Sequence, residues 1–487
     1  MGAMDLAAGV LRDAAAAAGN LAAAATMIDP NADEGATPGD ATAHSTRFVV
    51  VGIGADGWAG LSDAARTELR SATVVYGSER QLALLRDDGA SGPAVTAELR
   101  PWRSPMSAHL ADVLSAASDG ADVAADGGDV NLVHILASGD PMFHGVGSSI
   151  VAAVGRHQVR VIPAPSSASL AAARLGWDLA GVRIVSTVHA DPTGIVPDLA
   201  AGRRLLILSR NEATPAAVAD ILTRHGFGRS PLIVLEQLGG PAERITEAPA
   251  CRWADTRVRA NIDPDSGVAS AGIGEGASEL PVPDPLNIIA VDCVGPAGGR
   301  GPGLPDSTYE HDGQLTKSAI RALTVAALNP GGNQVLWDIG AGSGSVAIEW
   351  LRADRGGRAI AFERDPERAK RIDRNAQGHG VSDALEIRGA VPDALAAAAV
   401  PDAVFIGGGL DAHIADVAWE ALRAGGRLVV NAVTVETQSL LTARHATFGG
   451  TLRRIALETA EPLGSLTTWR PALPIVQWVA DKSGDTP

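Results

Sequence analysis

Three glycines and two acids form the most informative group of residues in this 487-residue chain. Gly340, Gly342 and Gly344 lie directly after a short apolar run, in a turn that opens with Asp338. Glycines allow a tight turn and let a ligand approach the backbone, beside the unpaired N–H groups at the start of a helix. Glu363 follows 19 residues after Gly344 (363 − 344), at the end of the next apolar run. A carboxylate placed there can accept both hydroxyls of a ribose, so the pattern predicts a nucleoside-binding turn.

The spacing of the glycines distinguishes two kinds of cofactor. A dinucleotide fingerprint requires Gly-x-Gly-x-x-Gly, with the pyrophosphate at the helix N-terminus. Here the third glycine comes one residue early, and Ser345 occupies the dinucleotide position. The acid Asp338 suits a cationic sulfonium and an amino acid tail better than a pyrophosphate. The pattern therefore indicates a methyltransferase that uses S-adenosylmethionine, and the alternative is a structural turn beside a surface glutamate.

This part of the chain resembles class I methyltransferases. It is more closely similar to the decarboxylating, C-terminal half of the corrin-pathway methyltransferases, over roughly residues 309–481. Three further segments carry the closer resemblance: Asp312-Gly-Gln-Leu-Thr-Lys317, Arg388-Gly-Ala-Val-Pro-Asp-Ala-Leu395 and Pro401-Asp-Ala-Val-Phe-Ile-Gly-Gly-Gly-Leu410.

The resemblance assigns expected roles to residues of these segments. The residues expected at S-adenosylmethionine are Gly340, Gly342, Gly344, Glu363 and Ala390. The residues expected to border the methyl acceptor are Gly407, Gly408, Gly409, Thr316 and Lys317. For the last two, a helix N-cap and a solvated lysine are the alternative.

A second glycine turn, Gly52-Ile-Gly-Ala-Asp-Gly57, follows an apolar run near the start of the chain. No acid ends a neighbouring run at the distance that a dinucleotide site requires. Two loops follow downstream, one with Gly-Asp-Pro and one with paired serines. In this order the three elements resemble the tetrapyrrole methylase family, which binds S-adenosylmethionine in a cleft between two α/β lobes. The resemblance implies that the cofactor contacts are Ser138, Gly139, Asp140, Ser166 and Ser167. A structural role is the alternative for either serine alone.

Apolar runs that alternate with amphipathic segments predict the elements that position these residues. Such alternation indicates an α/β protein with mostly parallel sheets covered on both faces. Strands are expected over 48–53, 131–137, 159–162, 205–209, 232–235, 286–291, 335–339, 359–363, 403–406 and 427–430, with a late edge strand over 474–480. Helices are expected over 106–117, 147–154, 215–225, 317–328 and 343–351. The resemblances imply a two-lobed tetrapyrrole methylase (class III methyltransferase) fold, followed by a Rossmann-like class I methyltransferase fold.

Capping residues and face patterns give finer expectations for the C-terminal helices. Thr316 is expected to cap the helix over 317–328, with Ile320, Leu323 and Ala327 on one face. Arg321 of this helix is expected on a solvated face, with a place at the cleft mouth as the alternative. A further helix is expected to have Asp365 as its cap and Pro366 at its first position. In the N-terminal half, the segment from Glu236 to Ile245 resembles one branch of the corrin-pathway methyltransferases, and an ordinary surface pair of Glu236 with Arg244 is the alternative.

Composition divides the chain into segments. Residues 1–45 form an Ala- and Gly-rich arm, which we expect to be disordered. A tetrapyrrole methylase unit is expected over 46–294, with a Gly-, Pro- and Ser-rich loop over 254–285. Residues 295–308 are dense in Gly and Pro and are expected to link this unit to the second unit, 309–487.

Charge and cysteine content exclude several classes of protein. The formal net charge of −16 argues against a nucleic-acid binder, whose affinity comes mainly from Lys and Arg on phosphates. Cys251 and Cys293 have no metal-like spacing, so we expect core thiols and no metal site. No apolar run approaches the ~20 residues that span a membrane, which leads us to expect a soluble, cytoplasmic protein.

Both halves, in this order, resemble one branch of the corrin-pathway enzymes. The resemblance implies methylation of a precorrin-6 type tetrapyrrole at C-5 by the first unit. It implies methylation at C-15 and decarboxylation of the ring C acetate by the second unit. The expected partner is this small molecule, in a homo-oligomeric enzyme, and no catalytic residue is identified. The alternatives are a two-site methyltransferase for another substrate, such as RNA, and a sensor that binds S-adenosylmethionine without turnover.

Overall fold

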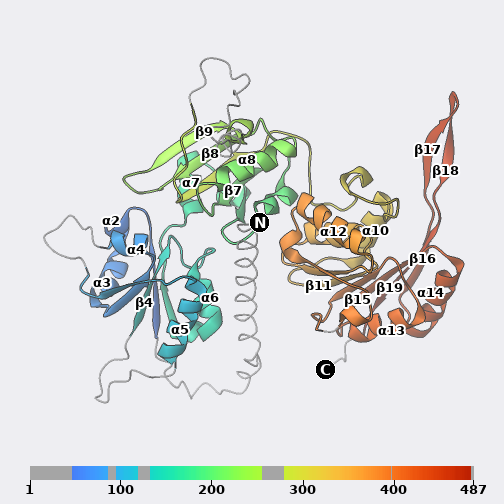
Figure 1. Cartoon of the computed structure of the whole chain (residues 1–487), viewed down its shortest axis with the longest axis horizontal. Helices are drawn as coiled ribbons and strands as arrows, with labels where there is room; N and C mark the ends of the chain where they lie inside the picture. The colour runs from blue at the N-terminus through green and yellow to red at the C-terminus, as the bar shows by residue number, and fades with distance from the viewer. Residues whose placement is uncertain (1–46, 86–94, 119–131, 255–278, 396, 484–487) are drawn as a thin grey trace, which may run out of the picture.

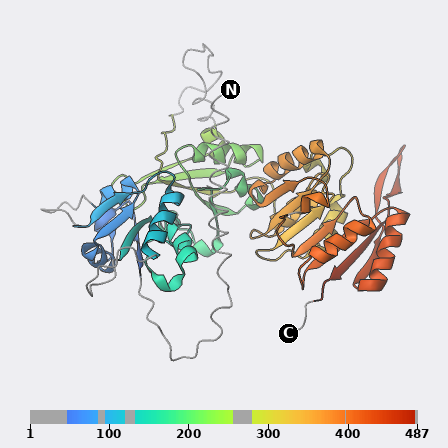
Figure 2. The same cartoon turned by 60° about the horizontal axis from the view of Figure 1, so that its bottom comes forward.

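The computed structural model describes residues 47–85, 95–118, 132–254, 279–395 and 397–483. The predicted arm 1–45 and most of the predicted loop 254–285 lie outside these residues. Three large sheets form the described chain, two in the N-terminal half and one in the C-terminal half (Figure 1). The second sheet lies between the first sheet and the C-terminal unit (Figure 2). None of the described helices is long and apolar enough to cross a membrane.

The first sheet is entirely parallel and has the order β3-β2-β4-β1-β5. Its strands are β1 (Phe48–Ile53), β2 (Val74–Gly77), β3 (Glu98–Pro101), β4 (Val133–Ser138) and β5 (Val159–Ile162). The helical elements of this lobe are α2 (Gly57–Gly60), α3 (Asp63–Ser71), α4 (Glu79–Leu84), α5 (Met106–Ser118), α6 (Val146–Val154) and η1 (Arg156–Gln158). Alternate side chains of β1 enter two cores: Val49 and Val51 pack with α3 and α4, while Phe48 and Val50 pack with α5 and α6. Because both faces are covered, the strand is apolar at every position.

The second sheet has the order β6-β7-β10-β8-β9, in which only β6 and β7 pair in parallel. Its elements are α7 (Ser167–Leu175), η2 (Leu179–Gly181), β6 (Val182–Ser186), η3 (Pro192–Asp198), β7 (Arg204–Leu208), α8 (Thr214–Arg224), β8 (Pro231–Glu236), β9 (Arg244–Pro249) and β10 (Asn287–Asp292). The prediction of a mostly parallel sheet is wrong for this lobe. The short connection from β8 to β9 permits only antiparallel pairing, and β10 enters between β7 and β8 with both faces covered.

The C-terminal sheet has seven strands in the order β13-β12-β11-β14-β15-β19-β16. Its strands are β11 (Val335–Ile339), β12 (Arg358–Phe362), β13 (Leu385–Arg388), β14 (Ala403–Ile406), β15 (Arg427–Ala432), β16 (Thr451–Ile455) and β19 (Ile475–Asp481). The first five of these are parallel, and β19 runs antiparallel to both of its neighbours. The prediction that 474–480 is an edge strand is wrong, because β16 covers it. The residues of β16 are exposed or half-buried, and its sequence lacks the apolar run that predicts a buried strand.

Helices cover both faces of this sheet. The helical elements are η4 (Asp306–Thr308), α10 (Ser318–Leu328), α11 (Ser345–Ala353), α12 (Pro366–Gly378), η5 (Ser382–Ala384), η6 (Asp393–Leu395), α13 (Ala412–Ala421) and α14 (Val435–Phe448). One core lies under α10, α11 and α12, and the other lies under α13 and α14. A two-stranded hairpin, β17 (Glu458–Leu463) with β18 (Leu466–Pro471), projects away from the sheet (Figures 1 and 2).

Helix α10 differs from its prediction in three ways. Lys317, rather than Thr316, is the N-cap residue, and no side chain caps the helix. Leu323 is exposed, although Ile320 is buried as expected. Arg321 is fully buried, so neither a solvated face nor a cleft mouth describes it. Two polar side chains with buried partners, Arg321 and Thr324, occupy the inner face of the helix, which accounts for the places of Arg321 and Leu323.

Three other local expectations have clear outcomes. Asp365 caps α12 as predicted, since its side chain accepts the backbone N–H groups of the second and third helical residues. Cys293 is buried but Cys251 is exposed, so the expectation of two core thiols is wrong for Cys251. Glu236 is buried and accepts two hydrogen bonds of 2.6 Å from Arg244, in a bidentate pair rather than an ordinary surface contact.

Candidate functional site

A cavity of about 860 Å³ opens at the carboxyl edge of the C-terminal sheet. Parallel strands deliver their following loops to one edge, so the ends of β11, β12 and β14 meet there. The start of α10 and the base of the hairpin complete the wall. Nine of the ten predicted C-terminal site residues line this cavity: Gly340, Gly342, Glu363, Ala390, Thr316, Lys317, Gly407, Gly408 and Gly409. The sequence segments that carry them are far apart, and the sheet brings them together.

The tenth residue, Gly344, does not line the cavity. It is the N-cap residue of α11, with a φ of 74°, and a Cβ there would lie 2.7 Å from Cγ2 of Ile372. Packing between α11 and α12 therefore accounts for this glycine. Gly340 has a different constraint, because a Cβ there would lie 2.4 Å from the carbonyl oxygen of Gly408. The loops after β11 and β14 approach each other this closely only because Gly340 has no side chain.

Glu363 is buried at the end of β12 and faces the glycine turn. Its Oε2 accepts the N–H of Gly342 at 2.9 Å, and its Oε1 accepts the N–H of Asp365 at 3.0 Å. A carboxylate has about four lone-pair sites, so each oxygen keeps capacity for one further donor. The two backbone bonds fix the orientation of the carboxylate beside the cavity. This arrangement fits a group with two adjacent hydroxyls, such as a ribose.

Asp338 joins two elements of the fold and does not line the cavity. Its Oδ2 accepts the N–H of Ala347 at 3.1 Å, which joins β11 to the first turn of α11. Its Oδ1 accepts no hydrogen bond from the described residues. Burial, together with the nearby charge of Glu363, raises the pKa of Asp338 to about 7. The expected direct role of this acid toward a cationic ligand therefore has no support in the wall of the cavity.

The cavity wall also carries cations that were not named from the sequence. Arg364 and Arg368 line the cavity together with the predicted Lys317, whose side chain is 63% exposed. Arg368 is held by Asp312 at 2.8 Å. The hydrogen bond from the Gln314 N–H, together with Arg368, lowers the pKa of Asp312 to about 2. A wall of this kind can bind an anionic ligand.

The base of the projecting hairpin forms an apolar part of the wall. Leu457 and Leu473 line the cavity, and Leu473 is 80% exposed. An exposed leucine beside a cavity offers apolar surface to a ligand. No sequence signal marks these residues, because the hairpin has no strand pattern. The hairpin reaches the cavity wall only because β16 and β19 hold its base there.

Three loops of the first lobe meet at the carboxyl edge of its sheet. A Cβ on Gly52 would lie 2.3 Å from the Gly139 oxygen and 2.7 Å from the Ala164 nitrogen. This contact follows from the strand order, in which β1 lies between β4 and β5. The predicted residues Ser138, Gly139, Asp140, Ser166 and Ser167 all lie in these converging loops or directly next to them. The glycine turn at Gly52 thus has a packing role toward both of the other loops.

Several of these residues already have local partners. Ser166 caps α7 by accepting the Ser169 N–H at 3.1 Å, and Asp140 accepts the Met142 N–H at 2.9 Å. Ser167 is exposed at the first position of the same helix.

Ser138 is exposed, and it accepts hydrogen bonds from Arg80 at 2.7 Å and Gln81 at 3.0 Å. Neither Arg80 nor Gln81 was predicted from the sequence as a site residue. The capping box that Ser78 forms with Gln81, directly after β2, is a signal that could have drawn attention to this edge.

Comparisons with known proteins give a separate family match for each half of the chain. Residues 47–251 match the family of tetrapyrrole (corrin/porphyrin) methylases, and residues 307–482 match the precorrin methyltransferase domain. A precorrin-6Y C(5,15)-methyltransferase [decarboxylating] of Mycobacterium tuberculosis is 44% identical over 436 residues, which cover 89% of this chain and 100% of that protein. The chain belongs to the precorrin-6Y C(5,15)-methyltransferase (decarboxylating) family.

A second relative that matches most of the chain gives the same result. A relative from Sinorhizobium sp is 41% identical over 437 residues, which are 88% of this chain and 95% of that protein. The crystal structure of the C-terminal domain of precorrin-6Y C5,15-methyltransferase from Rhodobacter capsulatus is 47% identical. It covers 38% of this chain and 100% of that domain, with a TM-score of 0.37. The predicted fold class, a tetrapyrrole methylase unit followed by a class I methyltransferase unit, is confirmed.

Proposed function

We propose that this chain uses S-adenosylmethionine to methylate a precorrin-6 type tetrapyrrole at C-5 and C-15, and that it removes the carboxyl group of the ring C acetate. Membership of the family carries the proposal, because the relatives that match almost the whole chain are named for this reaction. We assign the C-5 step to the unit over 46–294 and the C-15 step with decarboxylation to the unit over 309–487, the boundaries predicted from the sequence.

The C-terminal cavity supports the assignment of a methyl donor and an acceptor. Gly340, Gly342 and Glu363 offer backbone approach and a buried carboxylate, which suit the ribose and amino acid tail of S-adenosylmethionine. Lys317, Arg364 and Arg368, which line the same cavity, suit the carboxylates of a tetrapyrrole, and Leu457 and Leu473 suit its apolar face. The residues therefore offer groups for two ligands of different chemistry in one cavity.

The chemistry places modest demands on the residues of the chain. When bound, S-adenosylmethionine supplies an electrophilic methyl group, and the meso carbons of a reduced tetrapyrrole are electron-rich. The protein has to align the acceptor carbon with the methyl group and the sulfur, and to exclude water. A strong base is not needed for this step. For decarboxylation, the macrocycle accepts the electron pair of the broken C–C bond, and an acid returns one proton to the carbon that is left.

The direct test is to incubate the full chain with precorrin-6B and S-adenosylmethionine and to weigh the product. We expect a gain of two methyl groups together with the loss of carbon dioxide. An unchanged mass would contradict the proposed function. Turnover of tRNA instead of the tetrapyrrole would favour the rival methyltransferase, and cofactor binding without turnover would favour the rival sensor.

Replacing Glu363 with Gln separates the two proposed sites. One of its oxygens becomes an amide nitrogen that cannot accept a ribose hydroxyl or the N–H groups that now orient the side chain. We expect C-15 methylation to fall by about 100-fold, as for a misplaced reactant, while C-5 methylation stays at the wild-type rate. Mass spectrometry of the product resolves one methyl group from two. Glu367→Gln, on an exposed side chain of α12, is the matched control. An equal fall in both steps would contradict two independent sites.

A further inference from the structure

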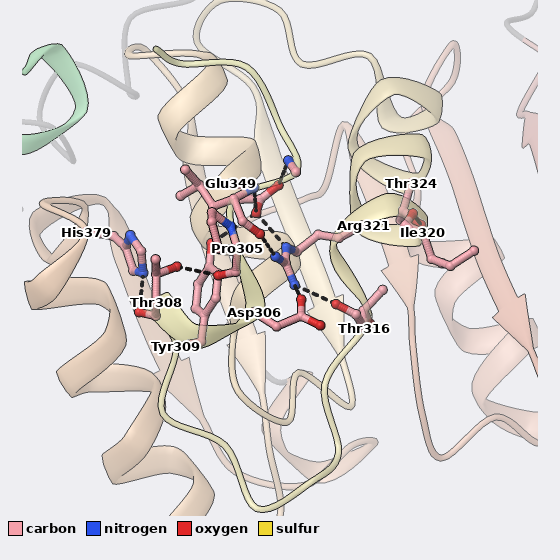
Figure 3. Close-up of polar contacts among 12 residues, drawn as sticks. Pro305, Asp306, Thr308, Tyr309, Thr316, Ile320, Arg321, Thr324, Glu349 and His379 are labelled. Atoms are coloured by element: carbon pink, nitrogen blue, oxygen red, sulfur yellow. Dashed lines mark hydrogen bonds and ion pairs between the residues drawn. The ribbon is translucent and has the colours of Figure 1, made fainter. Parts of the chain in front are cut away.

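The guanidinium of Arg321 is fully buried at the N-terminal end of α10, where it donates hydrogen bonds to four other residues (Figure 3). Its Nε donates to Oε1 of Glu349 at 2.5 Å, and its Nη1 donates to the carbonyl oxygen of Thr316 at 2.5 Å. Nη1 also reaches Oδ1 of Asp306 at 3.3 Å, and Nη2 donates to the carbonyl oxygen of Leu304. These partners come from α11, from the loop before α10 and from the interdomain linker. One side chain thus joins three segments that are distant in the sequence.

Glu349 extends this network along the linker. Its carboxylate is buried, and it accepts the N–H groups of Gly303 at 2.6 Å and Leu304 at 3.0 Å. It also accepts the hydroxyl of Tyr309 at 3.2 Å, and the Arg321 guanidinium lies 4.7 Å from the centre of the Tyr309 ring. The carboxylate therefore fixes the path of residues 303–309 against α11. Figure 3 shows these groups converging on Arg321 and Glu349.

The network ends at the wall of the C-terminal cavity. Thr316, whose carbonyl Arg321 holds, lines that cavity, and so does the next residue, Lys317. Asp306, which Arg321 contacts on one oxygen, is 3.5 Å from the Lys317 ammonium through its other oxygen. No side chain caps α10, and the hydrogen bond from Arg321 to the Thr316 carbonyl fixes the chain just before the helix.

We propose that Arg321 is a positioning residue for the C-terminal reaction. Through the Thr316 carbonyl and through Asp306, it fixes the segment 314–317 that forms the macrocycle side of the cavity, and it ties this segment to the interdomain linker. The inference rests on the proposed function of this cavity. Only arginine meets the geometry, because its planar fork donates in several fixed directions at once, whereas lysine presents a single point charge.

A full-length Arg321→Met/Glu349→Gln double variant separates positioning from general stability. Removing Arg321 alone would leave a buried carboxylate without its cation, which destabilises a fold strongly, whereas removing both charges together avoids this. The amide that replaces the Glu349 carboxylate keeps an oxygen for one of the two linker N–H groups, and nothing replaces the donor to Thr316. We expect cooperative thermal unfolding at a temperature somewhat below that of the wild type. We expect kcat/KM for precorrin-6B in the C-15 step to fall by about tenfold to 100-fold. The KM for S-adenosylmethionine and the rate of C-5 methylation should not change.

Two further variants complete the experiment. Asp306→Asn keeps the buried ion pair but releases Lys317, so we expect a several-fold rise in the KM for precorrin-6B in the C-15 step alone. Arg427→Met is the matched control, because Arg427 donates to the carbonyl of Ala327 at the other end of α10. We expect it to leave C-15 kinetics unchanged.

Each outcome bears on the inference. A folded double variant with wild-type C-15 kinetics would overturn it, and so would an equal loss in both methylations or in the KM values of both ligands. If the double variant does not fold, a wild-type KM for precorrin-6B in Asp306→Asn overturns the inference, and a selective rise supports it. A wild-type chain that leaves the mass of precorrin-6B unchanged would instead contradict the proposed function itself.

Discussion

Asp338 shows how burial changes the behaviour of one residue. Its pKa of about 7 lies above the ordinary aspartate value, so the folded chain holds this proton more tightly than the unfolded chain does. The stabilisation is complete below about pH 4 and is lost as the pH rises through about 7. We expect Asp338→Asn to remove this part of the pH dependence of the free energy of unfolding. Urea unfolding across this pH range measures it, with the fully exposed Asp63→Asn as the control. An unchanged pH slope would show that Asp338 is ionised in the fold.

At the scale of the element, the carboxyl edge of the first sheet depends on the close approach of three loops. Gly52 allows this approach, because a Cβ there would overlap the Gly139 oxygen. We expect Gly52→Ala to cost roughly 1–3 kcal/mol, as overpacking does, and to slow C-5 methylation while C-15 methylation continues. Thermal unfolding and product mass measure the two effects. Gly181→Ala, where a Cβ would meet nothing within 4 Å, is the matched control. Equal behaviour of the two variants would contradict the packing argument.

At the scale of the whole molecule, one buried carboxylate joins the two units. Asp198 of η3 forms ion pairs with Arg183 and Arg203 of its own lobe, with Arg300 of the linker and with Arg355 of the C-terminal unit. Removing its charge leaves partly buried guanidinium groups without a counter-charge. We therefore expect Asp198→Asn to lower the free energy of unfolding by about 3 kcal/mol.

Denaturant unfolding of the full chain measures this effect. Asp292→Asn is the control, because its pair with Arg204 is exposed on both sides and such pairs contribute at most about 1 kcal/mol. A loss in Asp198→Asn no larger than that of the control would mean that the units are held together by other contacts.

Much of the C-terminal site could be predicted from local sequence. A strand, a glycine turn and an acid at the end of the next strand are set by spacing along the chain, so Gly340, Gly342 and Glu363 meet at one cavity as expected. That these residues bind the cofactor at this cavity remains a prediction. Gly344 was grouped with them by spacing, but its neighbour Ile372 belongs to a helix whose position the spacing does not encode.

Sequence alone determined the α/β class and many of the apolar strands, because burial leaves a periodic pattern in the residues themselves. The fold families of the two units and their order came from the resemblance of their motifs to known families. Sequence did not determine which strands are neighbours. An apolar strand covered on both faces has the same composition in either direction, so the antiparallel β10 and the interior β19 were decided by long-range pairing.

The same limit applies to Arg321. A charged residue in a helix is expected to be exposed to solvent. Arg321 can be buried because the linker, α11 and the loop before α10 converge on it and supply its hydrogen-bond partners.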